Sequence, residues 1–297
     1  METKVNDKAN NKMSIKMPIK VPIKLSVSPG KVAVYTFLIV LAVLCFTPFY
    51  IMLMNSTHDN GEIATHLWLT PGTSLMDNYH SLIVSLPIWR GFFNSLFVAT
   101  TTTIVSGYFS ALTAYGFSRY KFKGNGVLYT IVLGSMMIPG QLGFIGFYQL
   151  VSSMDLINNY IPLIIPAVAS AGSVFFIKGY TDGAVHESLI EAARIDGCGE
   201  FTIFNKIALP LIMPAVATMS IFTFIATWNN YLLPLILLSD MDMYTLPIMQ
   251  VASRGVYKNE FGAIYTCIAI SVVPVMVAFA FFSKKIIGGL TMGGVKG

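Results

Sequence analysis

The chain has 297 residues, of which 55% are hydrophobic and 11% charged, and its mean hydropathy is +0.67. Soluble domains carry about 25% charged residues, so this composition excludes a soluble globular protein and indicates an integral membrane protein with several spans. The net charge of +5 comes mostly from the N-terminal tail and does not point to nucleic acid as a partner. Cys45, Cys198 and Cys267 are scattered, so they supply neither a disulfide framework nor metal-ligand spacing.

Residues 1–31 form a polar, basic tail in which lysine recurs at every fourth position from Lys4 to Lys24. This spacing would fit one face of a helix, but Pro18 and Pro22 would break a helix there. We therefore interpret the tail as an extended or disordered cytoplasmic segment. It either rests on anionic lipid headgroups or serves only to set the topology.

Residues 32–297 form the membrane domain, in which six apolar segments are each expected to cross the membrane as a helix. The segments are residues 32–55, 92–117, 126–151, 160–176, 211–238 and 261–282. The first carries no cleavage pattern and is expected to be an uncleaved anchor. Pro139 and Gly140 interrupt the third, and residues 56–91 form a polar connection whose Trp68 suits a membrane interface. The fold class expected is all-α with six transmembrane helices.

Basic residues predict the orientation of these spans. With the N-terminus in the cytoplasm, all but three of the 19 Lys and Arg residues lie on the cytoplasmic side. Arg90, Arg254 and Lys258 are the three that fall outside. Both termini and the segment 178–209 are therefore expected to be cytoplasmic.

The six spans contain no Asp, Glu, Lys, Arg or His. This counts against a proton-coupled carrier or an intramembrane protease, because both need ionisable groups within the membrane. The sequence also lacks a phosphate-binding loop of the G-x-x-x-x-G-K-[ST] type and an H-E-x-x-H motif. We expect no catalytic residue and no metal site in this chain, so directional work would be powered by a partner at the cytoplasmic side.

The segment 191–210 is the largest charged island after the tail. Leu189, Ile190 and Ala193 fall at helical spacing among acidic residues, which predicts a short amphipathic helix ending at Gly197 in a left-handed conformation. A second short helix, residues 200–208, is expected to follow before Pro210 starts the next span. The pattern predicts a helix–glycine–helix elbow on one membrane face.

Seven residues of this elbow match the order and spacing of the EAA motif of ABC importer permeases. They are Glu191, Ala192, Ala193, Gly197, Ile207, Leu209 and Pro210. Four further segments resemble the MalG-like permeases of carbohydrate importers, namely residues 94–96, 114–119, 227–231 and 289–297. The likeness therefore covers roughly residues 35–297. Two positions depart from the family pattern. His186 stands where a proline often precedes the motif, and Cys198 stands where alanine or serine is usual.

This resemblance implies a MetI-like type I ABC importer permease with cytoplasmic coupling helices, in a prokaryotic plasma membrane. It implies a heterodimer with a MalF-like second permease, two cytoplasmic ATPase subunits that bind ATP and Mg²⁺, and an extracytoplasmic solute-binding protein. The substrate implied is a sugar, with no cofactor in this chain. In that family the elbow sits in a groove of the ATPase, which assigns an ATPase-coupling role to the seven matched residues.

Uncharged polar side chains inside the spans are expected to face either a water-filled path or another helix. The group expected to contact a sugar consists of Gln141, Trp228, Asn229, Asn230 and Tyr231. Sugars are bound by planar polar groups and aromatic faces, which favours a substrate pathway, but hydrogen bonding between helices is an equally good interpretation.

The outer loop, residues 239–260, has charges of mixed sign and is longer than two antiparallel spans need. In MalG-like proteins the matching loop reaches into the binding protein. Here Ser253, Arg254 and Gly255 are the expected tip, with Gly255 allowing a tight turn. The alternative is a plain connector.

Two other functions remain open at this point. The chain could be an ABC permease for a peptide, phosphate or metal, although the Trp228-Asn229-Asn230 and C-terminal patterns favour a carbohydrate. It could also be a membrane scaffold that recruits a cytoplasmic partner without transporting anything. ATPase activity of the partner that depends on solute separates these two classes.

Overall fold

The computed structural model describes residues 29–256 and 260–294, and within these ranges the chain is helical without a strand. The basic tail up to residue 28 lies outside the described residues. The chain divides into two compact units, residues 1–48 and 49–297. In the first unit the structure describes residues 29–48, which belong to the 27-residue helix α1 (Pro29–Asn55). At 1.5 Å per residue this helix is about 40 Å long, which is enough to cross a bilayer.

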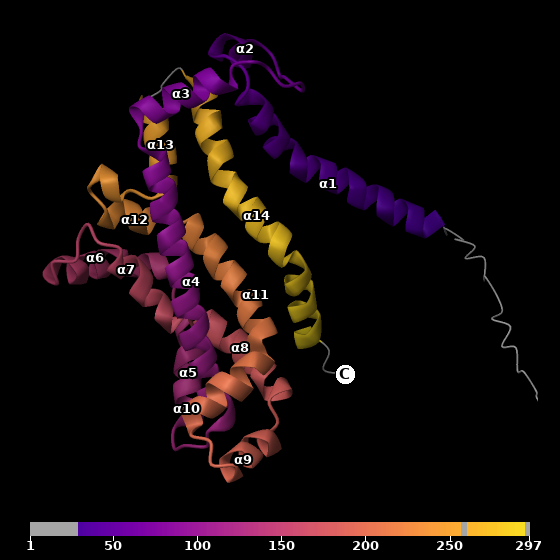
Figure 1. The fold of residues 1–297 in the computed structure, drawn as a ribbon, viewed down its shortest axis with the longest axis vertical. Helices are drawn as coiled ribbons and strands as arrows, with labels where there is room; N and C mark the ends of the chain where they lie inside the picture. The colour runs from indigo at the N-terminus through magenta and orange to yellow at the C-terminus, as the bar shows by residue number, and fades with distance from the viewer. Residues whose placement is uncertain (1–28, 257–259, 295–297) are drawn as a thin grey trace, which may run out of the picture. The chain divides into compact units, whose positions relative to one another are not determined.

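The second unit is built around α4 (Ile88–Arg119), which packs against α8 (Ala171–Ala184) and α11 (Leu209–Trp228) (Figure 1). The buried face of α4 carries small side chains, which are Ser95, Ala99, Thr102, Ser106, Gly107, Ser110, Ala111 and Ala114. Helices in membranes associate through such faces because small residues let the backbones approach closely. The last helix, α14 (Phe261–Gly294), packs along α11.

Short helices connect the long ones at both ends of this unit. Their bounds are α2 (Asn60–Thr65), α3 (Leu75–Ser85), α9 (Glu187–Ile195), α10 (Glu200–Ile203), α12 (Leu232–Leu237) and α13 (Leu246–Val256). The 3-10 turn η4 (Met241–Met243) precedes α13, and α9 and α10 lie together at one end in Figure 1.

The third and fourth predicted spans are interrupted helices. The third consists of α5 (Asn125–Ser135), η1 (Gly140–Gly143) and α6 (Phe144–Ser153), and its two halves are bent by 90°. The interruption falls at Pro139 and Gly140 as predicted, because Pro139 cannot continue the hydrogen-bond ladder of α5, but the sequence did not predict the size of the bend. The fourth consists of α7 (Ile161–Ile164), the 3-10 turn η2 (Ile165–Ala169) and α8.

Among the described residues, four helical stretches are long and apolar enough to cross a membrane. They are Pro29–Asn55, Ile88–Arg119, Ile161–Ala184 and Glu200–Trp228. The bent pair α5–α6 makes a fifth if it counts as one span, and α14 contributes the shorter apolar stretch Phe261–Val277. The all-α fold class is confirmed, and these helices fall within or across the six predicted segments.

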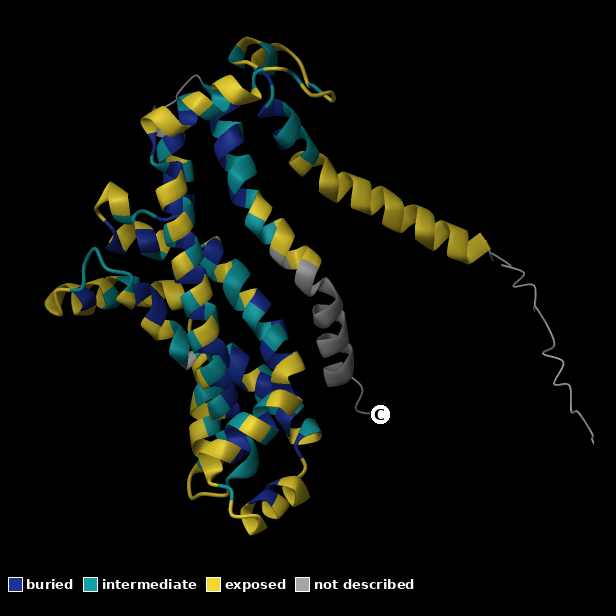
Figure 2. Cartoon of the chain, viewed as in Figure 1, coloured by how far each residue is buried: buried dark blue, intermediate teal, exposed yellow. Residues whose placement is uncertain are grey.

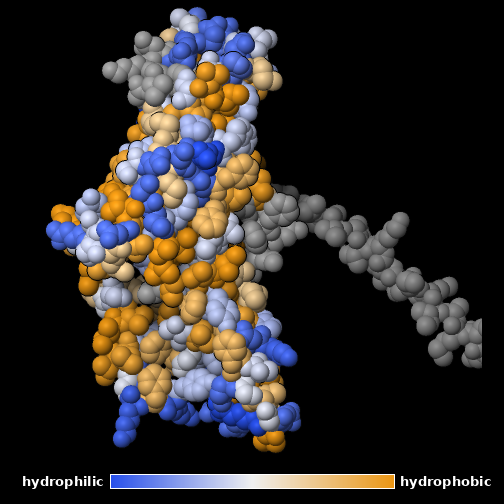
Figure 3. All heavy atoms as spheres, turned by 60° about the vertical axis from the view of Figure 1, so that its left-hand side comes forward, coloured by the Kyte–Doolittle hydropathy of each residue, from blue (hydrophilic) through white to orange (hydrophobic). Residues whose placement is uncertain are grey.

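The buried residues of the second unit form three clusters: one at α4, α8 and α11, one where α3, α4, α13 and α14 meet, and one at α6, α7 and α12. Figure 2 shows the buried positions along these helices. Outside these clusters the helices carry many exposed apolar side chains, as expected for surfaces that face lipid or a partner. On the face in Figure 3 the hydrophobic side chains form a broad band above the hydrophilic end that holds α9 and α10.

Candidate functional site

The predicted elbow is present at one end of the second unit. Its first arm, α9, turns Ile190 and Ala193 inward, where both are buried. They pack in a core cluster with Tyr115 of α4, Ile177 of α8 and Phe204. The amphipathic pattern seen in the sequence therefore seats α9 against the ends of two long helices.

Gly197 ends this arm with the left-handed conformation predicted, at φ +80°. The N–H of Gly197 donates to the carbonyl of Arg194 (3.0 Å), and the N–H of Cys198 donates to that of Ala193 (3.0 Å). These two bonds define a Schellman motif, which satisfies the last carbonyls of a helix and requires the left-handed residue. The half-buried Cys198 packs against the same core cluster as Ala193, which explains an apolar side chain at this position.

The second arm differs from the prediction of a separate short helix. Residues 200–228 form one continuous helical stretch, in which α10 passes through a π-helical turn, η3 (Phe204–Ala208), into α11. The N–H of Leu209 donates to the carbonyl of Phe204, five residues back. Pro210 has no N–H to give and disfavours the α-helical ladder before it, so a π turn lets the helix continue.

The seven residues of the matched motif divide between two faces of the elbow. Glu191 and Ala192 are exposed on α9, together with the apolar Leu189 and Ile195, and Ile195 is 86% exposed. The other five residues have structural roles. Ala193 is buried, and Gly197 makes the bend. Ile207 and Leu209 pack on the core cluster, and Pro210 follows the π turn. The face available to a partner is therefore acidic and apolar.

Three side chains form a polar bracket across the bend that the sequence analysis missed. Nε of Arg194 on α9 donates to Oε1 of Glu200 on α10 (2.7 Å), and the hydroxyl of Tyr120, just after α4, donates to Oε2. The Arg194 guanidinium also lies over the Tyr120 ring, 5.9 Å from its centroid. The signal in the sequence was a pair of opposite charges on either side of Gly197.

A second polar cluster joins the ends of α4 and α8 beside the elbow. Asp182 accepts hydrogen bonds from Ser118 Oγ (2.6 Å) and Lys178 Nζ (2.9 Å). Arg119 donates to the carbonyl oxygens of Thr181 (2.6 Å) and Asp182 (3.0 Å). The basic residues expected to mark a membrane boundary therefore also fix two helices to each other.

The expected pathway residues fall in different environments. Trp228 is buried, and its Nε1 donates to the carbonyl of Ser271 on α14 (3.1 Å). The predicted fifth span stops at Trp228, because residues 229–231 break the helix before α12. Gln141 lies apart from these residues, exposed in η1.

A cavity of about 260 Å³ opens at this helix break. Trp228 and Asn229 line it together with Gln250 and Ser271, along with Phe49, Leu246, Pro247, Val272 and Val275. Asn230 and Tyr231 do not line it. Sequence reasoning missed Gln250, because only the fold brings α13 next to the break.

The outer loop is also more structured than expected. Ser253, Arg254 and Gly255 lie in the last turns of α13, so the prediction of a tight turn at Gly255 was wrong. Leu246, Met249 and Ser253 are buried at helical spacing, and this buried face holds the segment as a helix against α14 and α4. Arg254 is exposed, and residues 257–259 lie outside the described residues.

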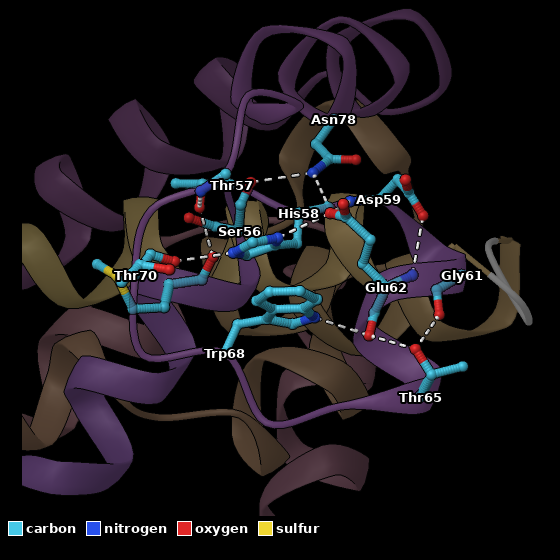
Figure 4. Close-up of polar contacts among 12 residues, drawn as sticks. Ser56, Thr57, His58, Asp59, Gly61, Glu62, Thr65, Trp68, Thr70 and Asn78 are labelled. Carbon is cyan, nitrogen blue, oxygen red and sulfur yellow. Dashed lines mark hydrogen bonds and ion pairs between the residues drawn. The ribbon is translucent and has the colours of Figure 1, made fainter.

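A buried histidine, which the sequence analysis did not single out, organises the connection between α1 and α3 (Figure 4). His58 is 4% exposed and stacks on Trp68, with ring centroids 4.8 Å apart. Its Nδ1 lies 2.7 Å from Glu62 Oε2 and its Nε2 lies 2.9 Å from the carbonyl oxygen of Thr70. Trp68, expected at a membrane interface, also donates from Nε1 to the carbonyl of Glu62 (2.9 Å) and so has an internal role.

Within the described part of the chain, no group of three His, Cys, Asp or Glu side chains could hold a metal ion. The chemistry that the elbow offers is docking and mechanical connection: an exposed acidic and apolar helix face mounted on the ends of long membrane helices.

Comparison with known proteins gives a consistent assignment. Residues 103–286 match the family described as binding-protein-dependent transport system inner membrane component. The arabinooligosaccharides transport system permease protein AraQ of Bacillus subtilis is 35% identical over 271 residues, covering 90% of this chain and 96% of that protein. The diacetylchitobiose uptake system permease protein NgcG of Streptomyces coelicolor is 30% identical over 263 residues, covering 87% of each chain.

A solved structure shares the fold. It is a chain in the crystal structure of a bacterial ABC transporter involved in the import of the acidic polysaccharide alginate, with a TM-score of 0.74 and 20% identity. The match covers 85% of this chain and 95% of that chain. The helical membrane domain and its elbow thus define a multi-pass ABC permease with the MetI-like fold.

The chain belongs to the family of inner membrane components of binding-protein-dependent transport systems. That family is the membrane component of such systems and not their catalytic subunit.

Proposed function

We propose that this chain is a permease subunit of a binding-protein-dependent ABC importer for a sugar or oligosaccharide in a prokaryotic plasma membrane. Its family membership supports the transport class, and the names of its relatives, which include an arabinooligosaccharide and a diacetylchitobiose permease, support the carbohydrate. The chain pairs with a MalF-like second permease and works with two ATPase subunits that bind ATP and Mg²⁺. A solute-binding protein delivers the sugar from outside.

The observation that carries this proposal is the geometry of the elbow. Glu191 and Ala192 stand exposed on α9, next to Leu189 and the almost fully exposed Ile195. An apolar side chain exposed beyond the reach of the bilayer is unfavourable unless a partner covers it. We assign this face to the groove of the ATPase, with Glu191 facing a basic residue there.

The orientation that this function requires follows from the charges. The elbow and both termini face the cytoplasm, because the basic residues of the membrane domain gather at that side. Cysteine variants test this placement directly: Asn60→Cys should react with an impermeant reagent only from outside, and Lys206→Cys only from inside. Labelling of both from the same side contradicts the proposed topology.

Transport by the assembled system tests the function. The chain is co-purified with its second permease and ATPase and reconstituted in vesicles with ATP inside and the loaded binding protein outside. We expect ATP-dependent accumulation of a labelled oligosaccharide, tested with arabino-, malto- and chito-oligosaccharides, and stimulation of ATP hydrolysis by the same sugar. Accumulation of a peptide or of phosphate in place of every sugar contradicts the substrate class. Assembly without any solute-dependent ATPase activity indicates a scaffold.

A further inference from the structure

We propose that Glu200 is a positioning residue of the coupling elbow. It fixes the angle between α9 and the helical stretch 200–228, so that a displacement of α9 by the ATPase moves α11 instead of being absorbed at the bend. This inference rests on the proposed function and assigns a residue outside the seven matched motif positions.

The backbone connection between α9 and α10 cannot fix this angle alone. After the cap residue Asp196 it consists of Gly197, Cys198 and Gly199. Two backbone hydrogen bonds hold Gly197 and Cys198 to the end of α9, whereas a Cβ added at Gly199, on the α10 side, would meet no atom within 4 Å. Glycine is the residue with the greatest backbone freedom, so the link can bend at Gly199.

Glu200 bridges this soft joint from one side to the other and adds a third element. One carboxylate oxygen accepts from Arg194, in the last turn of α9, and the other accepts from Tyr120, which directly follows α4. Hydrogen bonds to an ionised carboxylate are stronger than neutral ones, and a carboxylate held at both oxygens has a defined orientation. The carboxylate of Glu200 therefore joins α9, α10 and the end of α4 at one point.

The position of Glu200 in the chain determines which helix is displaced when α9 moves. It is the first residue of the continuous helical stretch that ends at Trp228, and Trp228 lines the cavity at the helix break. The stretch stays one continuous helix through its π turn and Pro214, and rigid secondary elements can carry coupling between distant sites. A push on α9 that reaches Glu200 is thus delivered to the other end of α11.

Other contacts at this end of the molecule offer matched controls. Lys121 and Glu187 form a 3.3 Å ion pair between the segment after α4 and the start of α9, with side chains 88% and 60% exposed. The side chains of Arg194 and Glu200 are 43% and 47% exposed, and Glu200 has a further partner in Tyr120. The more exposed pair is expected to contribute less. The core packing of Ile190 and Ala193 is independent of Glu200, so a variant that lacks the bracket should still fold.

The test combines a distance measurement with a coupling measurement in the assembled transporter. Spin labels at Ser188→Cys on α9 and Thr202→Cys on α10, in a background without the native cysteines, report the distribution of distances between the two arms. The number of oligosaccharide molecules accumulated per ATP hydrolysed reports coupling. The variants are Glu200→Gln, Arg194→Gln, the exchange of both charges in Arg194→Glu with Glu200→Arg, and Lys121→Gln as the control.

We expect Glu200→Gln and Arg194→Gln to widen the distribution of distances between the two arms. Both should lower the number of oligosaccharide molecules accumulated per ATP hydrolysed at least fivefold. The chain should still assemble with its partners. The charge exchange should recover at least half of the lost coupling, and Lys121→Gln should match the wild type. An unchanged distribution in Glu200→Gln, or a widened one with normal sugar per ATP, overturns the proposal. The two measurements fail independently. Absence of ATP-driven uptake in the wild type contradicts the proposed function. The distance measurement does not depend on transport, so it still shows whether Glu200 fixes the angle of the elbow.

Discussion

The imidazole Nδ1 of His58 lies 2.7 Å from the carboxylate Oε2 of Glu62. The other ring nitrogen, Nε2, faces the carbonyl oxygen of Thr70 at 2.9 Å. Both partners are hydrogen-bond acceptors, so both contacts are satisfied at once only when the ring carries two protons. The hydrogen bond to Thr70 raises the pKa of His58 above its usual value, burial opposes this, and the hydrogen bond and charge of Glu62 and the charge of Asp59 raise it further.

This arrangement predicts that the folded structure of the segment 56–74 is more stable at low pH than at high pH. Because the folded-state pKa of His58 lies above the unfolded value of about 6.5, the stabilisation is full below that value and is lost as pH rises through the folded pKa. Hydrogen exchange of residues 56–74, corrected for the intrinsic effect of pH, should show greater protection at pH 6 than at pH 9. His58→Gln should remove this difference, and His80→Gln, at an exposed position on α3, should keep it. Equal protection at both pH values in the wild type contradicts the prediction.

Gly197 and Gly199 give a matched pair of alanine substitutions. Gly197→Ala places a Cβ on a residue at φ +80°, which costs about 1–2 kcal/mol, whereas Gly199 has φ −71° and ψ 152° and accepts any side chain. We expect Gly197→Ala to lower the unfolding midpoint of the purified chain and Gly199→Ala to leave it unchanged. Gly197→Pro should be worse than alanine, because it also removes the N–H that caps α9. Equal midpoints for the two alanine variants would show that the bend tolerates a normal residue.

Gly262 allows a close contact between α14 and α3. An added Cβ would lie 2.5 Å from Cγ of Asn78, whose amide nitrogen donates to the carbonyls of Ser56 and His58 at 2.9 Å each. Gly262→Ala must displace Asn78 and break its two hydrogen bonds, at a cost of about 1–3 kcal/mol. Gly116→Ala in α4 meets no atom within 4 Å and should be neutral or stabilising. Thermal unfolding of the two variants in one detergent compares them, and a stable Gly262→Ala variant contradicts the packing described here.

The helix break at residues 229–231 predicts a role for Asn229 in the substrate path. Asn229 is exposed at the break and lines the cavity beside Gln250. We expect Asn229→Ala and Gln250→Ala to raise the KM for oligosaccharide uptake about tenfold, with basal ATP hydrolysis unchanged, because a lost hydrogen bond to a sugar costs about 1.4 kcal/mol. The control is Asn159→Ala, because Asn159 lies outside the cavity and its Oδ1 accepts from the N–H of Ile161. Unchanged uptake kinetics in both cavity variants would assign these residues to helix packing.

Local signals in the sequence explain the parts of the structure that were predicted correctly. Gly197 was assigned a left-handed conformation because a helix pattern stopped directly before it, and the elbow followed from that single residue. Pro139 and Gly140 marked the break in the third span, but not its 90° bend, because the angle depends on tertiary packing. The prediction at Gly255 was wrong because glycine alone does not make a turn, and the buried face of Leu246, Met249 and Ser253 before it holds α13 as a helix through Gly255.

The contacts that were missed join residues distant in sequence. His58 meets Thr70 across 12 residues and Tyr120 meets Glu200 across 80. Arg90 pairs with Asp242 across 152 residues, an ion pair that fixes the segment before α13 to the start of α4. Such side chains have no pattern of their own in the sequence, since either partner alone is an ordinary polar residue near a helix end.

Reversal of the charge at Glu191 tests whether the exposed face of α9 couples the ATPase to transport. Glu191 is exposed and has no role in the core cluster, so Glu191→Lys should leave the chain folded and in the membrane. Lys123→Glu, an exposed charge reversal at the same end but outside the elbow, is the matched control.

The measurement is the uptake of labelled oligosaccharide, together with its stimulation of ATP hydrolysis, by reconstituted transporters that carry each variant. We expect Glu191→Lys to lower both at least tenfold and Lys123→Glu to retain wild-type values. Wild-type uptake and wild-type stimulation in Glu191→Lys would contradict a coupling role for this face of α9.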